Sequence, residues 1–287
     1  MRDYVIFSDS GTDISPAKAN ELGVHIIDLL VIMNGETKLN REVDPKEFYA
    51  FLRDKGMATT SAVNLDAFTE AMEPTVKEGK DILYLGFSSG LSTTYNAGKL
   101  AAEELSEKYP DAKIYTVDTL CASLGQGLLV YLATKKKAEG ATIDELRDYI
   151  ESIKLNLCHW FTVDDLMFLK RGGRVGAASA AVGTVLGIKP VMHVDNEGHL
   201  INVAKARGRR AAVDALFDKA KNTMIGEHAN SSVFISHGDC IEDAEYLAER
   251  IKNEIGVKEV RIAYVGSVIG SHSGPGTLAL FFLGSER

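Results

Sequence analysis

Short apolar runs alternate with segments of helical periodicity along the first half of the chain. The apolar runs cover residues 4–8, 24–32, 82–86 and 114–117. Helices are expected to start near Pro16 and Pro45, to span residues 65–77, 96–108 and 123–139, and to start again at a capping box over 142–145. Because strands alternate with helices of this length, the pattern predicts βαβ units around a parallel sheet.

The second half of the chain is more mixed. Apolar runs typical of strands cover residues 159–162, 191–194, 200–204, 232–235, 259–264 and 276–282. Helical spacing covers residues 166–170, 209–222 and 241–255, and the turn residues 195–198 between two runs predict a hairpin. We therefore predict an α/β protein with an N-terminal parallel-sheet α/β domain over residues 1–157 and a C-terminal mixed α+β domain over residues 158–287.

The composition narrows the class of protein. The 287 residues carry a net charge of −8, with 45% hydrophobic and 25% charged residues, which is typical of a globular protein. An acidic chain of this kind is a poor nucleic-acid binder, because phosphates need a basic surface. No apolar stretch approaches ~18 residues and the N-terminus resembles a strand, so we expect no transmembrane segment, no signal peptide and a cytoplasmic location. The three cysteines lack C-x-x-C spacing and no metal-binding motif occurs, so we expect no metal or cofactor.

The strongest chemical signal is the turn Gly86-Phe87-Ser88-Ser89-Gly90-Leu91-Ser92-Thr93-Thr94-Tyr95 between an expected strand and an expected helix. It holds no charge and five serine and threonine hydroxyls, those of Ser88, Ser89, Ser92, Thr93 and Thr94. Backbone N–H groups at a helix start can hold an anion together with such hydroxyls. The same turn matches the G-x-S-x-G pattern of a nucleophile elbow, with Ser88 in the serine position. An anion cradle and a serine nucleophile therefore both stay open.

Two further segments are rich in glycine. Residues 266–276 hold four glycines around His272, which suits an oriented hydrogen-bond donor, a general base or a packed core residue. The stretch Arg171-Gly172-Gly173-Arg174 places two guanidinium groups beside permissive backbone, in a binding site or a surface turn.

Three segments give weaker signals. Residues 9–13 follow the first strand, where a parallel sheet binds ligands, but Asp, Ser and Gly are also ordinary turn residues. Residues 59–61 are expected to form a polar loop between two helices. Residues 175–188 are almost entirely Ala, Gly and Val, which predicts either the wall of an apolar cavity or close helix packing.

Taken in chain order, these segments resemble the DegV family, the bacterial fatty-acid-binding proteins also called FakB. The resemblance runs nearly end to end. It rests on Phe7-Ser8-Asp9-Ser10 with Asp13, Thr60-Ser61, Ser89-Gly90-Leu91-Ser92 with Thr94-Tyr95, Val117-Asp118, Asp165-Leu166 with Leu169-Lys170 and Gly172-Gly173-Arg174, Lys189-Pro190, and residues 266–276 around His272.

The resemblance implies two α/β domains with one long-chain fatty acid buried between them, in a carrier that is not itself an enzyme. It implies a partner as well, a dihydroxyacetone-kinase-like fatty acid kinase that forms an acyl phosphate for phospholipid synthesis. In the family, hydroxyls and a histidine hold the carboxylate, and arginines near the pocket entrance link to the carboxylate network or to the kinase. The matching ligand-binding positions in this chain are Thr60, Ser61, Ser92, Thr93, His272, Arg174 and Arg207.

Some positions depart from the family pattern. Ala62-Val63 stand where Gln-Pro is usual, Thr93 where Gly is usual, and Thr119 where Ser is usual. The hydrogen bonds around the carboxylate therefore stay open. Two alternatives remain, namely a serine hydrolase that uses Ser88 and His272, and a phosphometabolite-binding subunit without lipid, whose cavity would be lined by arginines.

Overall fold

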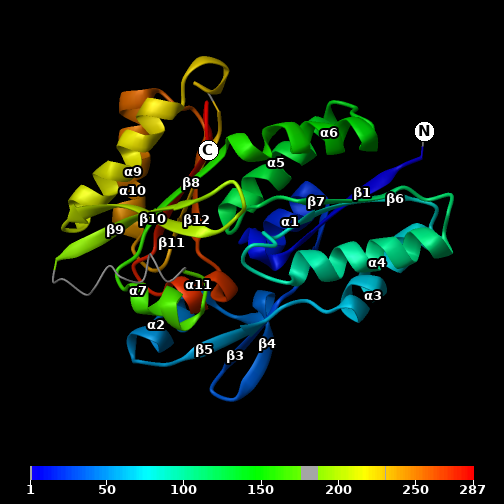
Figure 1. Ribbon diagram of the computed structural model, residues 1–287, viewed down its shortest axis with the longest axis horizontal. Coiled ribbons are helices and arrows are strands. Elements are labelled where there is room, and N and C mark those ends of the chain that lie inside the picture. Colours follow the sequence, from blue (N-terminus) through cyan, green and yellow to red (C-terminus); the bar gives the residue numbers. More distant parts are fainter. Residues whose placement is uncertain (1, 176–186, 230) are drawn as a thin grey trace.

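A four-stranded parallel sheet forms the first part of the fold, in a computed structural model that describes residues 2–175, 187–229 and 231–287 (Figure 1). Its strands follow the order β2-β1-β6-β7. They are β1 (Tyr4–Asp9), β2 (Val24–Ile27), β6 (Asp81–Gly86) and β7 (Ile114–Asp118). All three neighbouring pairs run parallel, which confirms the prediction from the alternating pattern.

Helices cover both faces of this sheet, and α1 (Pro16–Leu22) leads into β2. On one face, α3 (Leu65–Lys77) and α4 (Thr94–Lys108) bury Phe68 against Tyr84 of β6, with ring centroids 5.0 Å apart. On the other face, α5 (Leu124–Ala138) and α6 (Ile143–Ile153) pack on β1 and β6. The predicted capping box starts α6, because Thr142 Oγ1 accepts from the Glu145 N–H at 3.2 Å and the Glu145 carboxylate accepts from the Thr142 N–H at 2.8 Å.

A small antiparallel sheet stands beside α2 (Pro45–Arg53). Its order is β4-β3-β5, with β3 (Leu30–Met33), β4 (Glu36–Leu39) and β5 (Ala58–Ser61). The expectation of a polar loop over residues 59–61 is wrong, because β5 pairs with β3 and sets Thr60 opposite Val31. The apolar run 24–32 likewise divides between β2 and β3 in two different sheets. These pairings depend on partners distant in sequence, which local polarity does not reveal.

The second half of the chain forms a six-stranded mixed sheet in the order β10-β9-β8-β13-β11-β12. The strands are β8 (Leu157–Thr162), β9 (Ile188–Val194), β10 (Leu200–Arg207), β11 (Val233–His237), β12 (Val260–Tyr264) and β13 (Leu278–Leu283). β9 and β10 form the predicted hairpin. α9 (Arg209–Thr223), α10 (Ile241–Arg250) and the π-helical η5 (Ile251–Ile255) cover one face, and α5 packs on the other. The predicted fold class is confirmed.

Short helices complete the described chain. They are η1 (Ser10–Thr12), η2 (Asn40–Glu42), η3 (Lys154–Asn156), α7 (Leu166–Arg171), η4 (Gly226–His228) and α11 (Ser267–Ser273). α11 packs against α2, α7, β3 and β5, and it lies in the glycine-rich segment 266–276, for which no helix was expected. Residues 176–186 of the apolar stretch 175–188 lie outside the described residues. The domain boundary at residue 157 stays a prediction.

Candidate functional site

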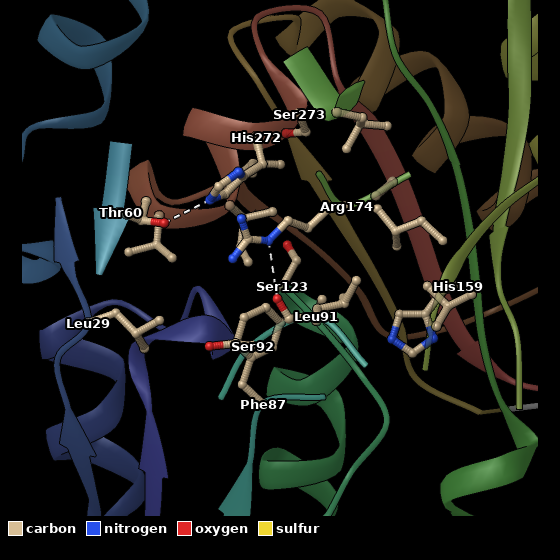
Figure 2. A pocket seen from close by; sticks show the side chains of 18 of the residues that line it. Leu29, Thr60, Phe87, Leu91, Ser92, Ser123, His159, Arg174, His272 and Ser273 are labelled. Carbon is tan, nitrogen blue, oxygen red and sulfur yellow. Dashed lines mark hydrogen bonds between the residues drawn. The ribbon is translucent and has the colours of Figure 1, made fainter. Parts of the chain in front are cut away.

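A cavity of about 660 Å³ lies beyond the carboxyl ends of the parallel strands (Figure 2). Apolar side chains form much of its wall. Leu29 follows β2, Phe87 follows β6, and on the facing side Phe161 lies on β8 and Phe281 on β13. In a parallel sheet, the carboxyl ends of the strands are the usual place for a ligand. The cavity therefore lies where sheet topology expects a binding site.

The predicted anion cradle forms the polar side of this cavity at the start of α4. Ser89, Ser92 and Thr93 line the cavity. Ser92 Oγ accepts from the Thr94 N–H at 3.2 Å and lies 2.8 Å from Thr94 Oγ1. The first turn of α4 holds no acidic residue, and its N-cap residue Thr93 makes no side-chain capping bond. Because first-turn N–H groups lack intrahelical partners and carry partial positive charge, this end suits an anion.

Thr60 of β5 and His272 of α11 meet at the same cavity although they are 212 residues apart in sequence. Thr60 Oγ1 and His272 Nε2 form a hydrogen bond of 2.7 Å (Figure 2). Burial, and secondly the charge of Arg174, lower the pKa of His272 from 6.5 to about 4. The imidazole is therefore neutral near pH 7 and acts as a hydrogen-bonding group rather than as a cation.

Arg174 joins the histidine to the hydroxyl turn. Its Nε donates to the Leu91 carbonyl at 3.2 Å and its Nη1 donates to the Gly172 carbonyl at 2.5 Å. Glycine is required at position 172, because an added Cβ would lie 2.3 Å from His272 Nδ1. Gly173 and Arg174 line the cavity, whereas Arg171 is exposed and places its guanidinium over the Phe168 ring.

The structure brings six of the seven predicted ligand-binding residues to the cavity wall. They are Thr60, Ser61, Ser92, Thr93, Arg174 and His272. Arg207 lies exposed at the end of β10 and is not among the residues that line the cavity. A role for Arg207 at the pocket entrance stays a prediction.

The candidate nucleophile Ser88 has a structural environment instead. It is fully buried and is not among the lining residues, and its Oγ donates to the Gly198 carbonyl at 2.9 Å. His272 has Thr60 as its hydrogen-bond partner. Ser88 and His272 therefore have separate partners, in contrast to the nucleophile–base bond that a hydrolase needs.

A second polar group on the wall was missed from the sequence. Ser123, just before α5, and Ser236 of β11 both line the cavity, with their Oγ atoms 3.0 Å apart. Ser123 also donates to the buried carboxylate of Asp13, and burial raises the pKa of Asp13 from 3.8 to about 7. Ser123 adopts φ +54°, which no local pattern predicts. The available signal was the segment 9–13, which already stood out as a turn or a ligand site.

Over the described ranges, no group of three or more His, Cys, Asp or Glu side chains could hold a metal ion. No helix among those same residues is long and apolar enough to cross a bilayer.

The fold defines an α/β protein with a cavity between its parallel sheet and its six-stranded mixed sheet. The chain belongs to the DegV family, since the family model described as "Uncharacterised protein, DegV family" matches residues 3–285. It is 48% identical over 290 residues to a DegV domain-containing protein of Clostridium perfringens, covering 100% of this chain and 99% of that protein. It is 34% identical over 288 residues to one of Streptococcus pyogenes serotype M3, covering 99% of each. The predicted family is confirmed.

Solved structures show the same fold. A DegV family protein from Thermus thermophilus, described by its fatty acid binding, superimposes with a TM-score of 0.89 at 28% identity, covering 99% of this chain and 100% of that one. A Thermotoga maritima protein described as revealing a fatty acid binding function gives a TM-score of 0.84 at 28% identity, with the same coverage of 99% and 100%.

Proposed function

We propose that this protein binds one long-chain fatty acid in the cavity and presents its carboxylate to a partner fatty acid kinase, which forms an acyl phosphate. The observation that carries the proposal is the polarity of the cavity. Hydroxyls, a neutral imidazole and Arg174 gather where α4, β5 and α11 meet, and apolar side chains such as Phe161 and Phe281 form much of the remaining wall. The fatty acid binding of the Thermus and Thermotoga relatives supports the same ligand here.

The energetics of acyl burial agree with a cavity of this kind. A long-chain acid offers about fifteen CH₂ groups, each contributing roughly 0.8 kcal/mol on burial, or about 12 kcal/mol together. Association and ordering cost on the order of 4–15 kcal/mol. Binding is therefore tight only when the cavity is preformed and the carboxylate is fully hydrogen-bonded, since an unpaired buried carboxylate would cancel much of the gain.

The polar side of the cavity supplies those hydrogen bonds. Thr60 and Ser92 donate their hydroxyl protons to the carboxylate, and His272 Nε2–H donates to Thr60 Oγ1 so that the Thr60 proton is free for the ligand. A bound carboxylate near His272 favours the imidazolium. The pKa of His272 is therefore expected to rise from about 4 when the acid binds, as NMR titration of the imidazole would measure.

Exposure supports presentation of the carboxylate to a partner. The hydroxyl residues Ser61, Ser89 and Thr93 are exposed at the polar side of the cavity, whereas Val265 and Phe281 are buried. An acid bound with its head among the hydroxyls has its carboxylate nearest to solvent. The protein then acts as a carrier, and the phosphoryl transfer takes place on the kinase.

Lipid extraction and mass spectrometry of the purified protein test the ligand. Ser92→Ala is expected to retain far less acid than the wild type, because a hydrogen bond to a charged group contributes about 1.5–3 kcal/mol, or roughly ten- to a hundredfold in affinity. His272→Ala is also expected to retain less acid, because it removes the group that orients the Thr60 hydroxyl. Ser106→Ala is the matched control. Ser106 lies on α4, and its hydroxyl donates to the backbone carbonyl of Ala102 on the same helix. Undiminished and unselective acid content in both site variants would overturn the proposal.

Two further outcomes separate the alternatives. A cavity that yields no acyl chain but binds phosphorylated metabolites would favour the non-lipid subunit, although Arg174 is the one arginine among its described lining residues. Labelling of Ser88 by a fluorophosphonate probe would favour the hydrolase. The kinase is tested by adding purified fatty acid kinase and ATP to protein loaded with labelled acid, and the expected product is an acyl phosphate.

A further inference from the structure

The helix that carries His272 lacks a capping residue of its own. α11 has seven residues, Ser267–Ser273, and its N-cap residue is Gly266, which makes no side-chain capping bond. Serine, valine, isoleucine, glycine and histidine are all mediocre or poor helix formers, and helices this short are unstable in isolation. Contacts from other parts of the chain must therefore hold α11 in place.

Position 266 cannot accept a conventional capping residue. An added Cβ at Gly266 would lie 2.5 Å from Asp13 Oδ1, and the Asp13 side chain is held there by its bond with Ser123. Serine, threonine, aspartate and asparagine, the usual N-cap residues, all carry a Cβ. The orphan N–H groups at the start of α11 must find their acceptor elsewhere.

Asn40 of η2 supplies that acceptor. Its Oδ1 accepts from the Val268 N–H at 3.2 Å and from the Ser267 hydroxyl at 2.7 Å. A backbone N–H can only donate, so the amide atom that faces Val268 is the oxygen. The Asn40 backbone is itself held, because its N–H donates to the carbonyl of Leu29, a cavity-lining residue, at 3.1 Å.

We propose that Asn40 is a positioning residue for the ligand site, which caps α11 from 228 residues away in sequence and thereby sets His272 against Thr60. The proposal rests on the fatty acid site described above. Val268, Ile269, His272 and Ser273 of α11 all line the cavity, so a shift of this helix moves one wall and the carboxylate contact together. Tyr49 also holds the chain just before α11, since its hydroxyl donates to the Val265 carbonyl at 2.9 Å.

Asn40→Ala tests the proposal in the full-length protein, with palmitate binding and the titration of His272 as readouts. Palmitate is expected to bind roughly two- to thirtyfold more weakly, which is the range that the loss of one helix cap produces. The pKa of His272, measured by NMR on delipidated protein, is expected to rise from about 4 toward 6.5, because a loosened α11 exposes the ring to water. Ser267→Ala removes one of the two bonds and is expected to give a smaller change in the same direction.

Asn64→Ala is the matched control. Asn64 caps α3, where its Oδ1 accepts from the Ala67 N–H at 2.9 Å, and it does not line the cavity. It is expected to lower thermal stability while leaving palmitate affinity and the His272 pKa unchanged. The proposal is overturned if Asn40→Ala does the same. A wild type that binds no acid, together with a His272 pKa that still moves in Asn40→Ala, would reject the fatty acid function and retain the positioning role.

Discussion

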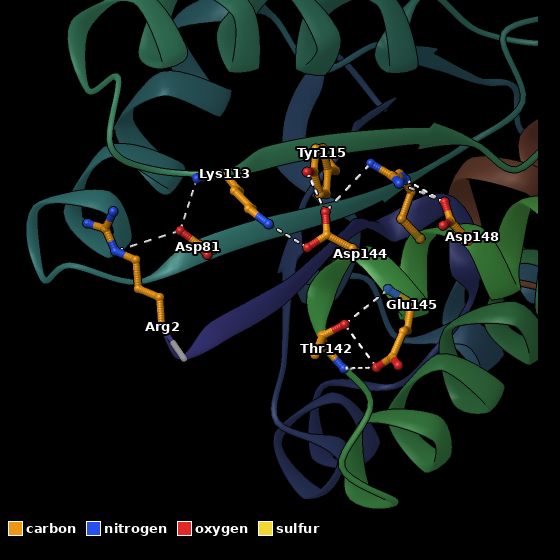
Figure 3. Close-up of polar contacts among 9 residues, drawn as sticks. Arg2, Asp81, Lys113, Tyr115, Thr142, Asp144, Glu145 and Asp148 are labelled. Atoms are coloured by element: carbon orange, nitrogen blue, oxygen red, sulfur yellow. Dashed lines mark hydrogen bonds and ion pairs between the residues drawn. The ribbon is translucent and has the colours of Figure 1, made fainter.

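The two ends of the four-stranded parallel sheet, where its strands begin and where they finish, provide hydrogen-bond partners for polar groups in different ways. At the carboxyl edge, Ser92, Thr60 and His272 surround the cavity without forming an ion pair with one another. At the amino edge, charged side chains pair among themselves (Figure 3). The two edges differ in how many hydrogen bonds they can still form. Hydroxyls around a cavity can still bind a ligand, whereas charges that are paired with one another already have their partners.

At the amino edge, the carboxylates of Asp81 and Asp144 each have more than one partner. The Asp81 carboxylate accepts from the Lys113 N–H at 2.9 Å and lies 3.7 Å from Arg2 Nε. Asp144, in the first turn of α6, pairs with the Lys113 ammonium and accepts from the Tyr115 hydroxyl at 2.7 Å. The hydrogen bond from Lys113 is the main cause of the lowered pKa of Asp144. These contacts join strand ends to a helix start and leave little for a ligand.

Burial sets the cost of a charge at each edge. Asp13, behind the cavity, has a carboxylate oxygen that is shielded from solvent, and burial raises the pKa of this carboxyl group to about 7. Asp144 has a side chain that is 40% exposed, and its pKa falls. An ion pair near water contributes little to the stability of the fold. The stability that a buried carboxyl group contributes depends strongly on whether that group is protonated. Substitutions at the two edges are therefore expected to differ in size as well as in effect on the ligand.

The largest effect is expected from Asp13→Asn. The folded pKa of about 7 lies above the ordinary 3.8, so the native state binds the proton more tightly than the unfolded state. The contribution of this tightly held proton to stability is complete below pH 3.8, and it falls by roughly 4 kcal/mol as the pH rises to 7. Asparagine keeps the hydrogen-bonding shape without the titration.

Chemical denaturation from pH 4 to pH 8 checks this prediction. As the pH rises, the free energy of unfolding of Asp13→Asn is expected to increase relative to that of the wild type. Asp9, whose pKa is also raised by burial, and the buried histidines titrate in both proteins. The difference between the two curves of stability against pH therefore isolates the contribution of Asp13. Parallel curves over the whole range would contradict it.

Gly125→Ala is expected to have the next largest effect. Gly125 lies in the first turn of α5, and an added Cβ would be 2.1 Å from His159 Nε2 and 2.8 Å from Phe281 Cδ1. Overpacking of this kind costs about 1–3 kcal/mol. Because His159 and Phe281 both line the cavity, acid content is expected to fall as well.

A double-mutant cycle gives the control for Gly125→Ala. His159→Ala removes the ring that the new methyl group meets, so the added cost of Gly125→Ala is expected to shrink in that background. Thermal unfolding measures the stabilities of all four proteins. Strict additivity of the two substitutions would mean that the His159 contact does not limit how closely α5 approaches the sheet.

A smaller effect is expected at the amino edge from Thr142→Ala. It removes the capping box of α6 and is expected to lower stability by about 1 kcal/mol, as loss of an N-cap typically does. Acid content is expected to stay at the wild-type level, since this cap lies at the other edge of the sheet. Lipid extraction beside thermal unfolding checks both statements, and a loss of acid would break the comparison between the edges.

The smallest effect is expected from Asp144→Asn. The pair with Lys113 is exposed, so its removal is expected to change stability less than Thr142→Ala does. Because the pKa of Asp144 is lowered, the small contribution of its charge is present above the ordinary pKa of 3.8 and lost in acid. Thermal unfolding at pH 7 in low and high salt measures it, and a salt-independent loss larger than that of Thr142→Ala would show that the pair is not a simple surface contact.

Local signals predicted much of the fold. Alternating apolar runs predicted the parallel sheet, the turn at 195–198 predicted the β9–β10 hairpin, and the capping box predicted the start of α6. These features depend on residues close in sequence or on periodicity. The hydroxyl turn before α4 was visible for the same reason, because five hydroxyls follow one strand without a charge.

Long-range pairing explains what the local signals missed. Thr60 was expected in a loop because its neighbours are polar, yet β3 completes its hydrogen bonds. α11 was not expected, because its helix depends on Asn40 for a cap. Ser123 and Ser236 approach each other only when α5 packs on β11. Each of these depends on a partner more than 25 residues away in sequence, as the pairing of Val31 with Thr60 illustrates.

The sequence by itself determined the α/β class, the family and the residue types from which a site could be built, because periodicity, caps and motifs are written in short stretches of the chain. Only the tertiary structure decided which of those residues share one cavity. It brought Thr60 to His272, left Arg207 outside the lining and buried Ser88 against Gly198. The physical reason is that a ligand site requires side chains from distant elements to satisfy one another in a common enclosed space, and that condition is met only after the sheets and helices have packed.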